Sequence, residues 1–147
     1  MKKVLIVDNS SYMRMFVKKI IERGGLYILY EASTKDEAIE MFKNEKPDIV
    51  TLNLNMSEFN RDGINVLTEI MKINPDAFVI VVSAVGYEDV KDKCIEMWAK
   101  TYIKKPFDTK TLLQALEEYD QQWKMLIKSI INYYLHIIIW NLKIQRL

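Results

Sequence analysis

An alternation of short apolar segments with longer helical segments constrains this chain more than any other feature. The apolar segments are rich in β-branched and aromatic residues, which is typical of strands covered on both faces, and they span 3–7, 27–32, 48–53, 77–83 and 101–105. Helical periodicity is expected at 10–23, 34–44, 63–73 and 87–97, and from about Thr109 onward. The alternation predicts βαβ units and therefore an α/β fold with a doubly wound, five-stranded parallel sheet.

Length and composition indicate one packed domain and give no sign of a strongly charged partner. With 147 residues, half of them hydrophobic, the chain is long enough for one packed domain with an appendage. Its 21 Lys and Arg against 20 Asp and Glu give a net charge of +1, so no overall field attracts nucleic acid. A single cysteine, Cys94, and the charged start MKKVLIVD favour a reducing, cytoplasmic location.

Polar side chains follow four of the expected strands. Ligands of such sheets collect at the carboxyl ends of the strands, where the strand order reverses. The residues found there are Asp8 and Asn9, Asn53, Ser83, and Lys105. We therefore expect an acid, two amides, a hydroxyl and an ammonium group to meet at one edge of the sheet.

The segments VLIVDNSSYMR, PDIVTLNLNM, VIVVSA and YIKKPF, in this order and spacing, resemble the CheY-like receiver domains of two-component response regulators. The resemblance covers about residues 1–122 and implies the flavodoxin-like strand order 2-1-3-4-5. It also implies two domains, a receiver at 1–122 and an apolar helical extension at 123–147.

The resemblance implies a role for each residue of the predicted crevice. The acidic pair of the family corresponds to Asp8 and Asn9, and the phospho-accepting aspartate corresponds to Asn53. The switch hydroxyl and the switch aromatic correspond to Ser83 and Tyr102, and the family's lysine corresponds to Lys105. Two of the three acids are thus amides in this chain.

The two amides predict a loss of ordinary aspartyl phosphorylation. A receiver accepts a phosphoryl group on a carboxylate oxygen, with Mg²⁺ neutralising the charge, and Asn53 has no anionic oxygen. Mg²⁺ prefers charged oxygen ligands, so we expect no metal cofactor, or weak Mg²⁺ binding through Asp8 alone. Asp8 and Lys105 sum to zero charge, which predicts that the Lys105 ammonium lies beside Asp8 and the Asn53 carbonyl.

A purely structural interpretation exists for each of these residues. Ser83 is then a polar strand end, Tyr102 a packed aromatic, Lys105 a solvated side chain and Asp8 a helix cap. Their joint placement at four strand ends favours the receiver.

Two segments depart from the family pattern. After the third strand the chain reads MSEFNRDG, with two extra residues before Gly63, and its Glu58 or Asp62 is a candidate for a displaced carboxylate. Trp98 stands where the family usually has a glycine at the end of the fourth helix. Since a bulky residue is strained in a left-handed helix stop, we expect that helix to end differently.

The tail is predicted to be one long amphipathic helix, because 107–147 contains no Gly or Pro. Its apolar side needs a partner, and a second copy is the most economical choice, as a homodimer or a helix exchange through residues 123–144. The expected interface residues are Trp123, Ile127, Ile130, Tyr134, Ile137 and Ile138. A membrane span is disfavoured by four polar residues within the apolar run, Lys128, Asn132, His136 and Asn141. An interfacial helix is disfavoured by its weakly basic polar face.

The sequence therefore predicts a cytoplasmic, non-enzymatic receiver of a two-component phosphorelay that acts as a phosphorylation-independent interaction switch. Its expected partners are a sensor kinase or an output protein. One alternative is a phosphorylatable receiver with an unusual acceptor, or one in which Asn53 replaces a native Asp by engineering. Another is a flavodoxin-like nucleotide binder, which the DNSSYM turn disfavours because it has no glycine-rich phosphate cradle.

Overall fold

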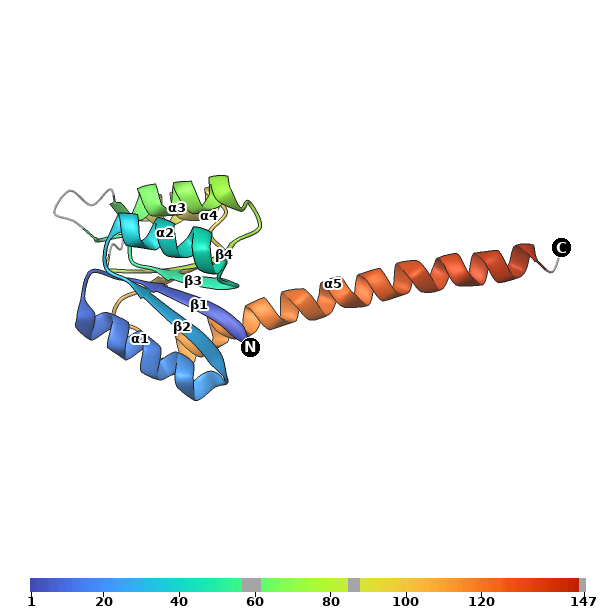
Figure 1. Cartoon of the computed structure of the whole chain (residues 1–147), viewed down its shortest axis with the longest axis horizontal. Helices are drawn as coiled ribbons and strands as arrows, with labels where there is room; N and C mark the ends of the chain where they lie inside the picture. Colours follow the sequence, from blue (N-terminus) through green and yellow to red (C-terminus); the bar gives the residue numbers. More distant parts are fainter. Residues whose placement is uncertain (57–61, 85–87, 146–147) are drawn as a thin grey trace. The chain divides into compact units, whose positions relative to one another are not determined.

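The computed structural model describes residues 1–56, 62–84 and 88–145, and strands alternate with helices along it as predicted (Figure 1). The strands are β1 (Lys2–Val7), β2 (Tyr27–Ala32), β3 (Ile49–Leu52), β4 (Phe78–Ser83) and β5 (Thr101–Lys104). The helices are α1 (Ser11–Gly24), α2 (Lys35–Glu45), α3 (Asp62–Ile73), α4 (Glu88–Glu96) and α5 (Thr109–Ile144). The predicted bounds of the strands and of the first four helices are correct to within one residue.

The five strands form one parallel sheet in the order β2-β1-β3-β4-β5, which confirms the expected topology. Leu52 at the end of β3 pairs with Val7 of β1 on one side and with Val81 of β4 on the other. This register brings the carboxyl ends of β1, β3 and β4 to the same edge of the sheet, where the predicted polar residues follow.

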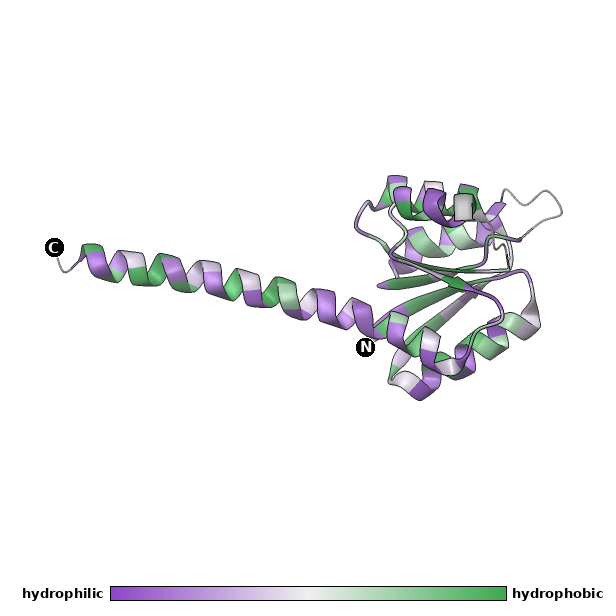
Figure 2. Cartoon of the chain, turned by 180° about the vertical axis from the view of Figure 1, so that it is seen from behind, coloured by the Kyte–Doolittle hydropathy of each residue, from purple (hydrophilic) through white to green (hydrophobic). Residues whose placement is uncertain are grey.

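Helices cover both faces of the sheet, with α2, α3 and α4 on one face and α1 on the other (Figure 1). Strand residues that alternate along the chain, such as Leu5 and Val7 or Val79 and Val81, pack with Val66, Leu67 and Ile70 of α3 into one buried cluster. Figure 2 shows hydrophobic strands between helices of mixed hydropathy. The core therefore surrounds the sheet, and the polar groups are left to the strand ends.

The end of α4 corrects one prediction, because Trp98 adopts the left-handed conformation, with φ 71°. The Trp98 N–H donates to Ile95 O at 2.9 Å and the Ala99 N–H to Cys94 O at 3.0 Å, a pair of bonds that defines a Schellman motif. Cys94 and Ala99 are both buried, which supplies the apolar contact that accompanies this motif. The helix therefore ends in the left-handed conformation that favours glycine, although a tryptophan is strained there. The Trp98 side chain is 73% exposed.

The chain divides into two compact units, Met1–Ala115 and Leu116–Leu147, so the predicted boundary at 122–123 lies inside the second unit. That unit is helical to Ile144, and its large apolar side chains from Trp123 to Ile144 are exposed. By length and composition α5 could cross a membrane, since its most apolar window has a mean hydropathy of 1.2 and none of that window is buried.

Candidate functional site

Three of the predicted site residues lie buried at the carboxyl edge of the sheet. Asp8 follows β1, Asn53 follows β3 and Ser83 ends β4, and their exposed fractions are 5%, 5% and 0%. The Asn53 N–H donates to Val7 O at 2.8 Å and the Lys105 N–H to Ser83 O at 2.8 Å, which continues the sheet pairing past the strand ends. The strands therefore hold the polar groups in a fixed crevice, hereafter the β-edge crevice.

The Asp8 carboxylate is the charged centre of the β-edge crevice. Lys105 Nζ donates to its Oδ2 at 2.9 Å, and the Ser10 N–H donates to its Oδ1 at 2.8 Å. Only 17% of the Lys105 side chain and 6% of the Asp8 side chain are exposed, so the two opposite charges form a largely buried ion pair. The Ser10 hydroxyl accepts from the Met13 N–H and caps α1, so Asp8 is not the cap of this helix.

The Asn53 amide nitrogen points toward three oxygen atoms. Its Nδ2 donates to Asn55 O at 2.9 Å and lies 3.4 Å from both Asp8 Oδ1 and Asn9 Oδ1. The Asn53 Oδ1 accepts from the Asn55 N–H at 3.3 Å, which is an Asx turn. Among the described residues, Lys105 Nζ bonds to Asp8 and makes no hydrogen bond with the Asn53 carbonyl.

Ser83 and Tyr102 contact one another on neighbouring strands. Burial raises the pKa of the Tyr102 phenol, and a hydrogen bond with the Ser83 side chain opposes part of that rise. Tyr102 also packs against the core cluster on the α3 face of the sheet. The predicted hydroxyl and the predicted aromatic thus contact one another.

Three further residues complete the β-edge crevice, and their roles were not predicted from the sequence. The Arg14 guanidinium donates to Asp8 O at 2.7 Å and also lies 3.4 Å from Glu31 Oε2. The Ser10 backbone and the Asn55 backbone supply the other contacts to Asp8 and Asn53. The contact with the Asn55 backbone could be predicted, because an asparagine side chain such as that of Asn53 commonly bonds to the backbone two residues on. The Arg14 contact could not, because it depends on how α1 packs.

Of the two displaced-carboxylate candidates, only Asp62 belongs to the described residues. Glu58 is outside the described residues, and Asp62 is in the first turn of α3. Within the described ranges, no group of three His, Cys, Asp or Glu side chains is placed to hold a metal ion. Among those same residues, Asn55 Oδ1 is a buried neutral oxygen without a hydrogen-bond partner.

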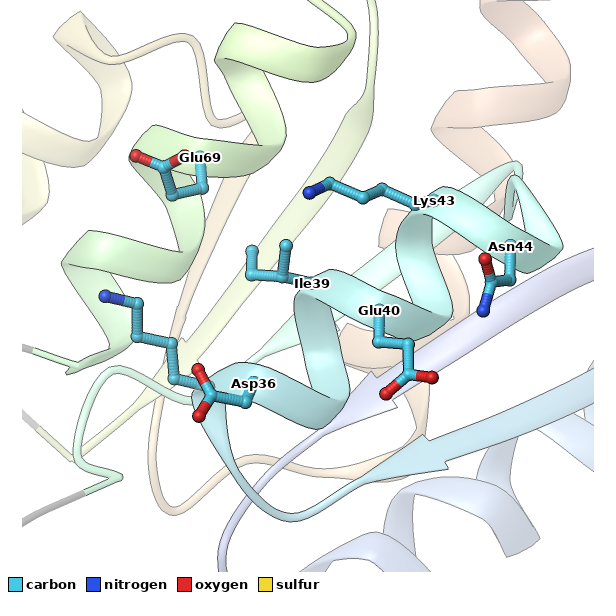
Figure 3. A pocket seen from close by; sticks show the side chains of 7 residues that line it. Asp36, Ile39, Glu40, Lys43, Asn44 and Glu69 are labelled. Atoms are coloured by element: carbon cyan, nitrogen blue, oxygen red, sulfur yellow. The ribbon is translucent and has the colours of Figure 1, made fainter.

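Two hollows lie on the surface of the first unit. One, of about 380 Å³, adjoins Lys105 and is lined mainly by apolar side chains: Tyr12, Met13, Phe16, Ala84, Pro106 and Phe107. The other, of about 450 Å³, lies between α2 and α3, where Ile39 and Lys43 face Glu69 (Figure 3). A hydrogen bond from Lys72, together with the charges of Lys72, Lys35 and Lys43, lowers the pKa of Glu69, which is typical of a solvated, charge-paired surface.

Comparison with known proteins agrees with the geometry of the β-edge crevice. The family model for the response regulator receiver domain matches residues 4–117. A chemotaxis protein CheY of Thermotoga maritima is 44% identical over 117 residues, which are 80% of this chain and 96% of that protein. CheY in a CheX-CheY-BeF3-Mg+2 complex from Borrelia burgdorferi superposes with a TM-score of 0.74 at 36% identity, over 80% of this chain and 87% of that one.

A CheY-like receiver domain protein of Methanospirillum hungatei superposes with a TM-score of 0.77 at 25% identity, covering 85% of this chain and 98% of that one. This chain thus has the strand order, the polar strand ends and the Ser83–Tyr102 contact described above. The three matches given above are CheY or CheY-like proteins, and the chain covers most of the length of each of them. The chain belongs to the response regulator receiver domain family of two-component signalling.

Proposed function

We propose that this receiver domain acts as a protein-interaction module that works without ordinary aspartyl phosphorylation. In this proposal Asn53 occupies the place of the phospho-accepting aspartate, and the module is not an enzyme. The β-edge crevice then holds one fixed arrangement instead of responding to a phosphoryl group.

The observation that carries the proposal is the pairing of charges in the β-edge crevice. Lys105 Nζ lies 2.9 Å from Asp8 Oδ2, so the two buried charges neutralise one another. Asn53 adds an amide whose nitrogen lone pair is delocalised into its carbonyl, and it offers no carboxylate oxygen to attack phosphorus. A phosphoryl group would therefore enter the crevice without an acceptor.

Mg²⁺, which the fold family implies, does not fit these residues. Asn53 Nδ2 donates to Asn55 O at 2.9 Å and lies 3.4 Å from Asp8 Oδ1 and Asn9 Oδ1, the oxygens that a cation would need. The partial positive charge of the amide hydrogens would repel a cation there, and the other Asp8 oxygen is engaged by Lys105. The unpaired Asn55 Oδ1 is neutral, so it adds no charge to attract a divalent ion.

A protein partner is the ligand that this proposal requires. The Borrelia burgdorferi relative is named in a complex with CheX, which supports a partner protein for a domain of this fold. Resemblance to the family points to α4, β5 and the start of α5 as the contact surface for a sensor kinase or an output protein.

Intact-mass measurement after incubation with acetyl phosphate and Mg²⁺ tests the proposal. The parent chain should gain no phosphoryl group, and Asn53→Asp together with Asn9→Asp should gain one because both missing acids are restored. Asn55→Asp is the matched control, since it adds a carboxylate two residues away without restoring the acceptor. A stable phosphoryl group on the parent chain would overturn the proposal.

We also propose that the second unit pairs two copies of the chain. The predicted interface residues Trp123, Ile127, Ile130, Tyr134, Ile137 and Ile138 are 38–61% exposed in the single chain. Leaving these side chains in water is costly, and a helical interface would cover them. Elution of the full chain as a monomer in aqueous buffer would contradict the pairing.

A further inference from the structure

The second unit carries two apolar stripes rather than one. The first seam repeats at alternating steps of three and four residues and consists of Trp123, Leu126, Ile130, Tyr133, Ile137, Trp140 and Ile144. The second seam runs beside it and consists of Ile127, Ile131, Tyr134 and Ile138. Side chains of the first seam are 38–66% exposed and those of the second 51–61%, so neither is covered within one chain.

A hollow on the helix surface borders the first seam. Its volume is about 550 Å³, and it is lined by Tyr133, Ile137 and Trp140 of the first seam together with His136, Ile139 and Lys143. The first seam therefore presents apolar surface to water, which burial against a second helix would remove.

One partner helix cannot cover both seams. At 3.6 residues per turn each residue advances by about 100°, which places the centres of the two seams roughly 100° apart around the axis. A pair of helices buries a single seam and leaves the other in water. In a four-helix bundle the directions from one helix to its two neighbours differ by about 90°, whereas in a triangle of three helices they differ by about 60°. The roughly 100° between the two seams is closer to the four-helix arrangement.

Most polar side chains of 123–144 lie where a bundle meets water, and Asn141 is the exception, midway between the two seams. Lys128, Asn132, His136 and Lys143 form a stripe roughly opposite the point midway between the two seams, by the same rotation of about 100° per residue. Met125 and Ile139 interrupt this stripe, and the remaining apolar side chains flank the seams. A helix in a bundle faces solvent on that side, so both seams are buried while the lysines stay hydrated.

A lipid bilayer accounts less well for the same pattern. The run without charged residues, 129–142, would span about 21 Å as a helix, which is shorter than the roughly 30 Å hydrocarbon core. Asn132 and His136 would lie near the middle of that run, on the side that carries the lysines.

We propose that residues 123–144 of four copies of this chain assemble into a four-helix bundle, with the first seam joining each helix to one neighbour and the second seam joining it to another. This inference rests on the proposed self-association and adds the number of chains. Four receiver units would then be displayed from one bundle.

Sedimentation velocity and native mass spectrometry of the full chain in aqueous buffer test the bundle. The parent should sediment at four times the 17.4 kDa chain mass. The variant Ile131→Gln with Ile138→Gln removes the second seam and should halve the assembly to two chains. The matched control Leu135→Gln with Leu142→Gln changes the same number of apolar residues outside both seams and should stay at four.

The outcomes separate this inference from the proposals before it. A parent of two chains, or a second-seam variant that stays at four, overturns the bundle but leaves pairing intact. A monomeric parent overturns both the bundle and the pairing. Flotation of the parent with phosphatidylcholine–phosphatidylglycerol vesicles would also overturn the bundle. None of these results bears on phosphorylation, which intact mass reports independently.

Discussion

Lys105 Nζ and Asp8 Oδ2 lie 2.9 Å apart although 97 positions separate the two residues in the chain. The contact joins the end of β1 to the segment that follows β5, so it forms only when the whole sheet has been assembled. The β-edge crevice therefore forms only in the folded domain, and loss of the Lys105–Asp8 contact should change the free energy of unfolding.

Removing the ammonium should destabilise the domain. Lys105→Met leaves the buried Asp8 carboxylate without its cation, and breaking a buried pair in this way typically costs about 3 kcal/mol. Urea unfolding should show the loss as a lower transition midpoint. Lys104→Met, on the exposed neighbouring residue, should leave the midpoint nearly unchanged.

A double-mutant cycle would identify the cause of that loss. Asp8→Asn combined with Lys105→Met removes both charges, so the double variant should be more stable than the sum of the single effects predicts. Strictly additive effects would show that the two groups do not stabilise one another.

Relieving the strain at the end of α4 should stabilise the protein. Trp98 has φ 71°, and a left-handed conformation costs a residue with a Cβ about 1–2 kcal/mol. Trp98→Gly should therefore raise the free energy of unfolding by about 1 kcal/mol. Trp98→Ala keeps the Cβ and is the control, because it should give no such gain; equal stability of the two variants would contradict the strain.

A side chain at Gly63 should distort the β-edge crevice. An added Cβ would collide with Leu54 Cα and lie 2.6 Å from Leu54 O and 2.7 Å from Asn53 O, all backbone atoms with little room to move. Gly63→Ala should lower the free energy of unfolding by about 3 kcal/mol. At Gly24 the nearest atom is the Leu113 side-chain Cδ2 at 2.7 Å, so Gly24→Ala should cost less than about 1 kcal/mol because a side chain can rotate away.

The Ser83–Tyr102 contact should appear in an alkaline titration. Burial raises the pKa of Tyr102, so the phenol's contribution to stability is complete below about pH 10, the ordinary tyrosine pKa, and is lost as the pH rises through the folded value. Since the Ser83 hydrogen bond opposes the rise, Ser83→Ala should raise the pKa of Tyr102 further. The tyrosinate difference spectrum against Tyr102→Phe isolates this group, and a lower pKa in Ser83→Ala would contradict the assignment.

Local patterns predicted most of the fold because the signals that define it are short in range. Apolar runs of a few residues separated by helical periodicity were sufficient for the strands and for the first four helices, and Thr34 caps α2 through the Glu37 N–H at 3.2 Å. The charge count also placed Lys105 beside Asp8 correctly. These inferences depend on the type of each residue and on its strand or helix, which a sequence shows directly.

Two details of the structure depend on a balance of competing local energies in the folded state. The Asn53 carbonyl accepts from the Asn55 N–H in an Asx turn that closes within two residues. Trp98 accepts a left-handed conformation because the Schellman bonds and the burial of Cys94 and Ala99 offset its strain. Neither balance is visible in a residue pattern.

By itself the sequence determined the α/β alternation, the polar strand ends and the apolar tail, since these follow from residue type and spacing along the chain. Only the tertiary structure decided which atom of each polar group faces which partner: the Asn53 nitrogen toward Asp8 and Asn9, and the Arg14 guanidinium onto the Asp8 carbonyl. Hydrogen bonds depend on distances of a fraction of an ångström between residues far apart in the chain, and packing of the complete sheet and its helices sets those distances.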